Sequence, residues 1–379
     1  MSNAPLATGA SRDLIGAGSR KAGSDFALKL RANSEYVAIP LLALAIAAAL
    51  FAVFLLAIGK SPVDFVSYVW RGGFGTSFSV QNTLQRSAPL ILTALAVAIP
   101  ARIGLIMIGG EGALVLGGFA AAVLAIPMLD HVPPMPTLIL MAIFSMIVGG
   151  FWVGLAGFLR YARGVNETIS SLLLTYIGIA IMNFFVEGAL RDLSDPNKPS
   201  TKPLGKAYMV GVIPGTEVHW GIVFGVALCV ALYFLMTRTT FGFAARLTGG
   251  NLRAALAQGL PVGRLIVACS AIAGACAGLA GFFEVAAIQG RANASLAAGY
   301  GFTGILVSFL ARHNPLAIPP VAILLGGLVA SGGLIQRRMD LPDATVLVLQ
   351  GLIFVVLLSS ETLYGRFSIF KPPAERGRT

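Results

Sequence analysis

Charged side chains are scarce in this chain of 379 residues. Asp, Glu, Lys and Arg together make up 11% of the sequence, against roughly a quarter in an ordinary soluble domain, whereas 56% of the residues are hydrophobic. This shortage excludes a water-soluble globular protein. Apolar runs of about 20 residues recur along the chain, which is the length that a helix needs to cross a hydrocarbon core about 30 Å thick. The predicted fold class is therefore an all-α, polytopic membrane protein.

Cysteine and histidine are also few. The three cysteines, Cys229, Cys269 and Cys276, all lie inside apolar runs, where thiols pack as small hydrophobic groups. This pattern predicts no disulfide and no redox role. The three histidines lie far apart in three different loops and have no metal-ligand spacing. We therefore expect neither a metal nor a cofactor.

The chain also lacks a credible nucleotide-binding motif. Gly59-Lys60-Ser61 resembles the end of a phosphate-binding loop, but Phe54 stands where that loop needs glycine. Residues 299–304 match G-x-G-x-x-G literally, but they follow a loop rather than a β-strand. With no catalytic constellation either, the chain is not predicted to be an enzyme. If it moves a solute actively, the energy comes from an ion gradient or from another subunit.

The net charge of +11 lies in loops and tails rather than on one face. Membrane topology explains such a distribution better than binding to nucleic acid does. Residues 1–35 are predicted to form a disordered cytoplasmic tail, residues 36–363 a transmembrane domain with a cytoplasmic loop at 237–264, and residues 364–379 a cytoplasmic tail. The run Tyr36–Gly59 is too long for a cleaved signal peptide and is interpreted as the first span.

About ten helices, within a range of eight to ten, are predicted to cross the membrane, with both termini in the cytoplasm. Gly301–Leu310 is short for a crossing, and nine spans result if it is re-entrant. Ten are favoured because they place the larger share of Lys and Arg, including the C-terminal tail, on the cytoplasmic side. The connector Lys60–Gln85 is expected at the membrane interface. The predicted spans are Tyr36–Gly59, Ser87–Ala101 (extended backward by Asn82–Arg86), Ile103–Ile126, Thr137–Leu159, Thr168–Leu190, His219–Met236, Leu265–Ile288, Gly301–Leu310, Leu316–Leu334 and Val346–Ser360.

A basic loop over residues 237–264 holds a predicted short helix. Asn251 is a good N-cap, Gly259 is a good residue to end the helix in a left-handed conformation, and Pro261 prevents continuation. The loop contains four arginines and no carboxylate. Two interpretations stay open: a part that another protein grips, or an ordinary connector whose arginines fix topology.

Three carboxylates fall in or near apolar spans. Glu111 lies among glycines, and Gly110, Glu111 and Gly112 are candidates for a translocation path or a broken helix, although an acid near a helix end is the simpler alternative. Asn166 and Glu167 are path candidates at the cytoplasmic mouth of the fifth span, where they equally suit a helix N-terminus. Glu284, in a span rich in Ala and Gly, is expected to serve helix packing or to lie at the outer interface.

Several stretches in sequence order resemble permease subunits of bacterial ATP-binding cassette (ABC) importers, in the branch for nucleosides, simple sugars and branched-chain amino acids. The resemblance covers Ser61–Leu363. Two positions depart from it: Met107 replaces an Asn, and Ala113 replaces a frequent Gln. The stretches that carry it are Ser87–Ala98, Ile108–Gly112, Asn166–Ile177, Gly250–Ala255 with Gly259, Gly299–Ile305 and Asn314–Leu316.

The resemblance implies a type II ABC importer-like permease of the bacterial inner membrane, most like the larger nucleoside-type permease. Its expected partners are a cytoplasmic ATP-binding subunit, a second related permease, an extracytoplasmic substrate-binding protein and membrane lipid. Nucleosides are the expected solute, with sugars or branched-chain amino acids as alternatives. An ion-coupled transporter would need an array of intramembrane carboxylates, and only Glu111 is suitably placed. The residues that match the family's ATPase-coupling loop are Gly250, Asn251, Leu252, Arg253, Ala254, Ala255 and Gly259.

Overall fold

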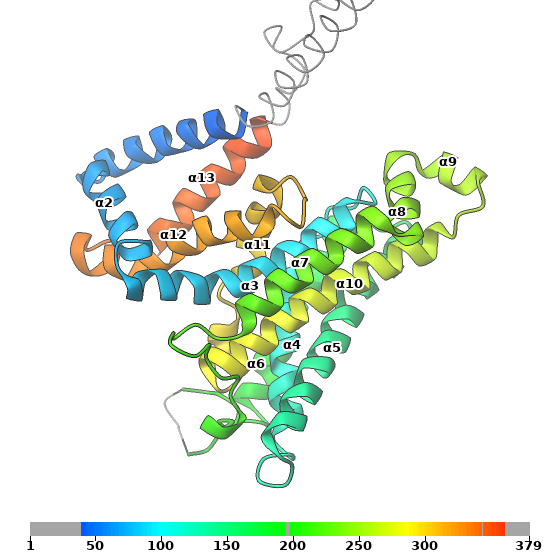
Figure 1. Cartoon of the computed structure of the whole chain (residues 1–379), viewed down its shortest axis with the longest axis horizontal. Coiled ribbons are helices and arrows are strands. Elements are labelled where there is room, and N and C mark those ends of the chain that lie inside the picture. Colours follow the sequence, from blue (N-terminus) through cyan, green and yellow to red (C-terminus); the bar gives the residue numbers. More distant parts are fainter. Residues whose placement is uncertain (1–38, 195–197, 343, 361–379) are drawn as a thin grey trace, which may run out of the picture. The chain divides into compact units, whose positions relative to one another are not determined.

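The computed structural model describes residues 39–194, 198–342 and 344–360. Across these ranges the regular structure is helical, with isolated β-bridges but no strand. The tails predicted for residues 1–35 and 364–379 lie outside the described residues. The helices are Ile39–Ala57, α2 (Pro62–Gly73), α3 (Ser77–Ala101), α4 (Gly110–Ala125), α5 (Pro134–Arg163), α6 (Glu167–Glu187), α7 (Gly221–Arg238), α8 (Thr240–Gly250), α9 (Leu252–Ala257), α10 (Val262–Phe283), α11 (Tyr300–Leu310), α12 (Ile318–Met339) and α13 (Ala344–Ser360) (Figure 1).

The predicted all-α membrane class is confirmed. Seven helices in the described ranges are long and apolar enough to cross a membrane. Three shorter apolar helical segments accompany them: α4, residues 294–310 and α13. The chain divides into two compact units, residues 60–350 and the flanking residues 1–59 with 351–379. The features described below belong to the first unit.

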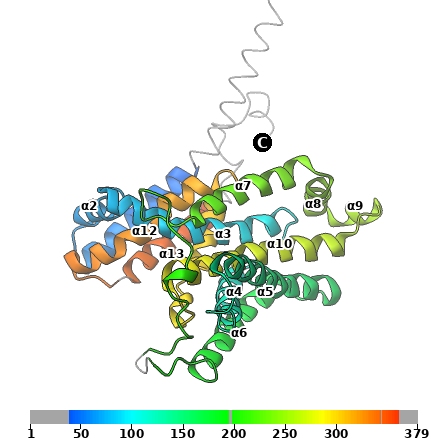
Figure 2. The ribbon, with the colours of Figure 1, turned by 60° about the horizontal axis from the view of Figure 1, so that its bottom comes forward.

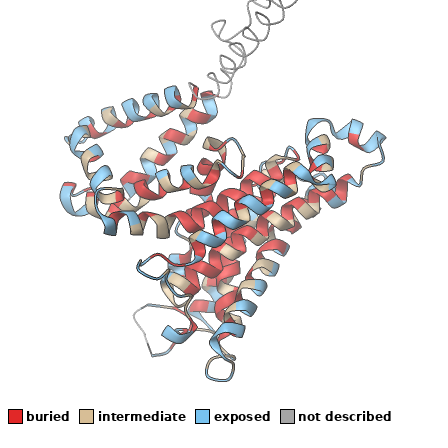
Figure 3. Ribbon diagram, in the orientation of Figure 1, coloured by how far each residue is buried: buried red, intermediate tan, exposed pale blue. Residues whose placement is uncertain are grey.

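Helices α3 and α10 form the interior of this unit. About three-quarters of the apolar stretch of each is buried, against about one-third for α5, α6 and α7, and Figure 3 shows the two as largely buried ribbons. Helix α10 packs closely against α4 and α5 (Figure 2). Glycines make this approach possible, because a Cβ on Gly278 or Gly281 would overlap the backbone of the neighbouring helix. Small residues at contacts are how membrane helices pack closely.

Two predicted boundaries are wrong. The connector Lys60–Gln85 is largely helical. Ser61 caps α2 by accepting the Asp64 N–H at 3.3 Å, and Thr76 caps α3 by accepting the Ser79 N–H at 3.1 Å. Polar residues at these positions look like loop in a hydropathy pattern, but they are N-caps.

The third predicted span begins too early. Residues 103–109 are not helical, and α4 starts at Gly110. The chain turns at Gly104 with φ +77°, which glycine adopts readily. The extended backbone that follows is held by polar contacts to α6, described below. Glu111 therefore stands in the first turn of α4 rather than inside a longer helix.

Candidate functional site

The short helix predicted in the basic loop is present as α9. The Asn251 side chain accepts the Ala254 N–H at 3.1 Å, as an N-cap does. Gly259 follows with φ +74°, and the Leu260 N–H donates to the Ala255 carbonyl at 3.1 Å. The residues expected to engage an ATPase thus extend from Gly250, the last residue of helix α8 (Thr240–Gly250), through the capped helix α9 to Gly259.

A second helix, α8, precedes α9 and was not predicted. Thr239 caps it by accepting the Gly242 N–H at 3.2 Å. The backbone N–H of Asn251 closes the last turn of α8 on the Leu247 carbonyl, while its side chain opens α9. Asn251 is therefore the joint between the two helices. The glycines in α8 concealed it in the sequence, although Thr239 was an available N-cap signal.

One face of α9 is exposed and partly apolar. Leu252 and Leu256 are 50% and 56% exposed, and they share a face because they are four positions apart on a helix. Arg253 lies exposed beside them, whereas Ala255 is buried against the protein. Two exposed leucines next to an arginine on a capped helix make a surface suited to another protein.

Helix α8 rests on the segment between α3 and α4. Gly249 packs so closely on Arg102 and Ile103 that a Cβ would overlap their backbone. The Arg102 Nη2 group donates to the His313 carbonyl at 2.9 Å, so the turn after α11 belongs to the same end. Burial, and then the positive charge of Arg102, lower the pKa of His313 to about 4. His313 is therefore neutral at physiological pH.

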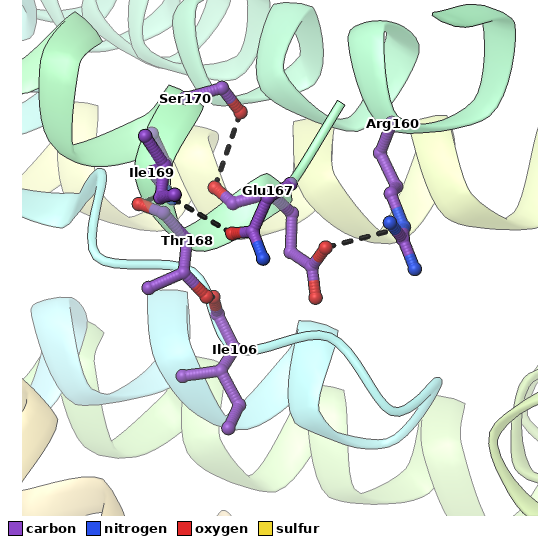
Figure 4. Close-up of polar contacts among 8 residues, drawn as sticks. Ile106, Arg160, Glu167, Thr168, Ile169 and Ser170 are labelled. Atoms are coloured by element: carbon purple, nitrogen blue, oxygen red, sulfur yellow. Dashed lines mark hydrogen bonds and ion pairs between the residues drawn. The ribbon is translucent and has the colours of Figure 1, made fainter. Parts of the chain in front are cut away.

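The segment 102–109 is in turn fastened to the start of α6. Thr168 Oγ1 donates to the Ile106 carbonyl at 2.7 Å, and the Ile108 N–H donates to Ser171 Oγ at 3.0 Å. Figure 4 shows Thr168 pointing at Ile106. These contacts tie the connection between α3 and α4 to α6.

Asn166 and Glu167 stand at this same helix start. Asn166 Oδ1 accepts the Ile169 N–H at 3.0 Å, which makes Asn166 the N-cap of α6. Glu167 Oε2 lies 3.2 Å from Arg160 Nε at the end of α5 (Figure 4). Both contacts match the helix-terminus alternative.

Glu111 is almost completely buried, with 1% exposure, and its carboxylate is held by backbone. Its Oε1 accepts the Gly299 N–H at 2.7 Å, and its Oε2 accepts the Gly301 N–H at 2.5 Å. These donors form the N-terminus of α11, where a negative charge is favourable. A Cβ on Gly301 would overlap the Glu111 backbone. The structure thus pairs Glu111 with the glycine-rich stretch before α11, and not with Asn166 or Glu167.

The flanking glycines of Glu111 have separate neighbours. A Cβ on Gly112 would lie 2.6 Å from the Thr175 Cα of α6, whereas one on Gly110 would meet only ordinary contacts, the closest at 3.8 Å from Gly301. Gly112 is thus required for packing, and Gly110 allows the α4 start to lie beside α11. In the described part of the chain, no three His, Cys, Asp or Glu residues gather as metal ligands.

These features define a helical, multi-pass membrane protein with a capped helical projection between two apolar helices. Residues 79–358 match the family described as Branched-chain amino acid transport system / permease component, and the chain belongs to this family. The protein is therefore a permease subunit of an ABC transporter in the bacterial inner membrane, and ATP hydrolysis belongs to a separate subunit in such transporters.

Characterised relatives cover most of the chain. The glucose ABC transporter permease protein TsgB13 of Haloferax volcanii is 32% identical over 85% of this chain and 87% of its own length. The guanosine ABC transporter permease protein NupP of Bacillus subtilis is 29% identical over 86% and 94%. The nucleoside ABC transporter permease protein NupB of Lactococcus lactis is 26% identical over 86% and 91%. No solved structure matches the chain.

Proposed function

We propose that this permease forms the membrane path of an importer that is driven by an ATPase bound at α9 and is supplied by an extracytoplasmic substrate-binding protein. The observation that carries the proposal is the α9 surface. Leu252, Arg253 and Leu256 are exposed on a helix that is capped at both ends, and α8 anchors it to the interior. The end of α8, helix α9 and the turn after it contain all the proposed coupling residues: Gly250, Asn251, Leu252, Arg253, Ala254, Ala255 and Gly259.

The contacts around α8 support a mechanical route from the ATPase to the membrane helices. Movement of α9 passes through Asn251 to α8, and through Gly249 to residues 102–104. Residues 105–109 carry it to the start of α6 through Thr168, and Glu111 carries it to the start of α11. Residues 102–109 directly follow α3. A movement of this segment would therefore displace α3, α6 and α11 together.

Within this mechanism, the path candidates Gly110, Glu111 and Gly112 act by holding the start of α4 in position. Both carboxylate oxygens of Glu111 are engaged by backbone N–H groups, so the side chain holds α4 and α11 together. Asn166 and Glu167 fix the start of α6 at the cytoplasmic mouth. Alternating access would then require these starts of α4, α6 and α11 to shift as a group.

We propose ten crossings with both termini in the cytoplasm, and the contacts at the two ends of residues 60–350 support the order of the crossings within this unit. Arg102, the α6 start and His313 gather with α8 at one end. The Tyr208 hydroxyl accepts the Asp130 N–H and donates to the Val132 carbonyl at the other. The 11 residues of α11 rise only about 16 Å, so residues 290–299 would complete its crossing as irregular backbone buried in protein.

For the solute, we favour nucleosides, because two of the relatives above are named for guanosine and nucleoside transport. The matched region covers 94% and 91% of the length of these two relatives. The relative named for glucose, at 32% identity, supports a simple sugar as the second candidate. The second permease is proposed to be a related chain. The ATP-binding subunit and the substrate-binding protein complete the proposed assembly.

A competition assay tests the solute. The complex, with its binding protein outside and ATP inside proteoliposomes, takes up a labelled nucleoside while glucose, a branched-chain amino acid or unlabelled nucleoside is added in excess. We expect only the unlabelled nucleoside to compete. If the nucleoside is not taken up and labelled glucose is, the sugar assignment replaces it.

A further inference from the structure

A second group of polar side chains lies buried between α3, the end of α10 and the start of α11, and the mechanism above assigns these side chains no role. Glu284 is 3% exposed and begins a π-helical turn, Glu284–Gln289, at the end of α10. Such turns recur at functional sites. The Gln289 amide donates to the Glu284 carboxylate, but Glu284 Oε1 is buried without a hydrogen-bond partner. A buried carboxyl oxygen left without a partner inside a membrane protein calls for a ligand or water.

Side chains of three other helices act on Glu284, and one of them is the Glu111 carboxyl group of α4. Arg86 of α3 acts on it electrostatically, and the Tyr300 hydroxyl at the start of α11 lies beside the Arg86 guanidinium. The Arg86 Nε group and the Gln289 Oε1 atom are also buried without partners. The group thus offers three buried polar atoms without hydrogen-bond partners. One is a cationic donor, Arg86 Nε, and two are acceptors, Glu284 Oε1 and Gln289 Oε1.

Aromatic rings border the same group. The rings of His219 and Phe283 stack with centroids 6.0 Å apart and an interplanar angle of 24°. Phe283 directly precedes Glu284, and the His219 ring also approaches the Gln85 carbonyl, next to Arg86. The stacked rings therefore adjoin the segment that carries Glu284 and the helix that carries Arg86.

A loop covers this group from outside. The Val210 N–H donates to the Ala286 carbonyl at 2.7 Å, and the Leu204 N–H donates to the Gly290 carbonyl at 2.9 Å. At the other edge, Gln85 Nε2 donates to the Glu217 carbonyl. The loop spans from the π-helical turn to α3, so the cluster lies directly beneath it. In the proposed topology this is the side that faces the binding protein.

The geometry points to a solute-binding station formed by Arg86, Glu284, Gln289 and Tyr300, which holds the vicinal hydroxyls of a sugar ring. Two neighbouring hydroxyls supply two O–H donors for Glu284 and Gln289 and oxygen acceptors for Arg86, so they satisfy all three open atoms. Charged hydrogen bonds of this kind are the stronger ones. The inference rests on the proposed solute import and names the chemical group recognised, which ribonucleosides and simple sugars share.

The test compares uptake of a ribonucleoside and its 2′,3′-dideoxy analogue by the complete complex. The binding protein is unchanged in every assay, so a change in the ratio of the two uptake rates arises in the permease. We expect Glu284→Gln and Gln289→Ala each to lower ribonucleoside uptake about tenfold, which corresponds to the loss of about one hydrogen bond, and to lower the analogue's uptake much less. Glu187→Gln, an exposed carboxylate at the end of α6, is the matched control and should leave the ratio unchanged.

Gln289 is only partly buried, so Gln289→Ala keeps the test open if Glu284→Gln fails to assemble. Equal losses for the ribonucleoside and its analogue would overturn the station and make the cluster structural. Wild-type uptake of glucose but not of ribonucleoside would overturn the nucleoside assignment alone. The same ratio, measured with glucose and 2,3-dideoxyglucose, which has no two neighbouring hydroxyls, then decides the station.

Discussion

The carboxylate of Glu111 accepts the backbone N–H of Gly301 at 2.5 Å, across 190 positions of sequence. The same carboxylate accepts the Gly299 N–H. A side chain of α4 therefore caps the N-terminus of α11. A buried carboxyl group is tolerated here because two backbone N–H groups at a helix N-terminus satisfy its oxygens. This contact is the link between the segment behind α8 and the helix that begins beside Arg86.

Replacing Glu111 with Gln should weaken that link. A glutamine oxygen accepts one N–H, while its NH2 group faces the other donor and leaves it unpaired at a cost of about 1–3 kcal/mol. Thermal unfolding of the purified permease measures the loss. Glu167→Gln is the control, because its ion pair with Arg160 is partly exposed and such pairs contribute about 0–1 kcal/mol. Equal losses in the two variants would contradict the capping role.

Asn251 should matter through its cap. Asn251→Ala removes the acceptor for the Ala254 N–H and costs about 0.5–2 kcal/mol of local helix stability, so α9 frays and solute-stimulated ATPase activity of the complex falls. Asn251→Asp retains a capping oxygen and should retain most of the activity. An Asn251→Ala complex with full stimulated activity would show that α9 needs no cap.

Close packing of α10 predicts sensitivity at its glycines. Gly278→Ala places a methyl group into the backbone of α5, and overpacking of this kind costs about 1–3 kcal/mol. Gly351→Ala in α13 has open space around the added Cβ and serves as the control. Detergent-solubilised melting temperatures should fall for the first variant only. An unchanged melting temperature for Gly278→Ala would mean that α5 and α10 lie further apart than the close contact at Gly278 requires.

His313 predicts an acid-sensitive end near α8. Its folded pKa of about 4 lies below the unfolded value of about 6.5, so the unfolded chain binds a proton that the folded chain does not. Stability is therefore lost as pH falls from about 6.5 toward 4. His313→Asn, which tolerates the local φ of +54°, should lose less between pH 7.5 and 5.5. His131→Asn, in the turn before α5, should behave as wild type.

Hydropathy and capping chemistry predicted much of the fold. The spans matching α5, α6, α7, α10 and α12 were placed from apolar length alone, because the membrane imposes that length on each helix. Asn251 and Gly259 predicted α9 since a cap acts over a few residues. The class of protein followed from several matched stretches in order.

The missed features depend on contacts that sequence position does not reveal. Helix α2 and the first turns of α3 look polar in a hydropathy pattern, but Gly72 and Gly73 of α2 pack on α12, and Thr83 of α3 lies against Gly326 of α12. The break at residues 103–109 is held by Thr168 and Ser171, about 60 residues away. Glu284 was interpreted as a packing or outer-interface residue, and its open oxygen becomes evident only when α3 and α11 bring Arg86 and Tyr300 beside it.

Charge reversal on α9 tests the central claim most directly. Proteoliposomes with the complete complex and its binding protein outside take up labelled nucleoside, with ATP inside or omitted. We expect ATP-dependent uptake by wild type and by Arg163→Glu, an exposed arginine at the end of α5. Arg253→Glu, or deletion of residues 251–258, should abolish it while the permease still inserts in the membrane. Normal ATP-driven uptake by those two variants, or uptake by this chain alone without ATP, would contradict the account.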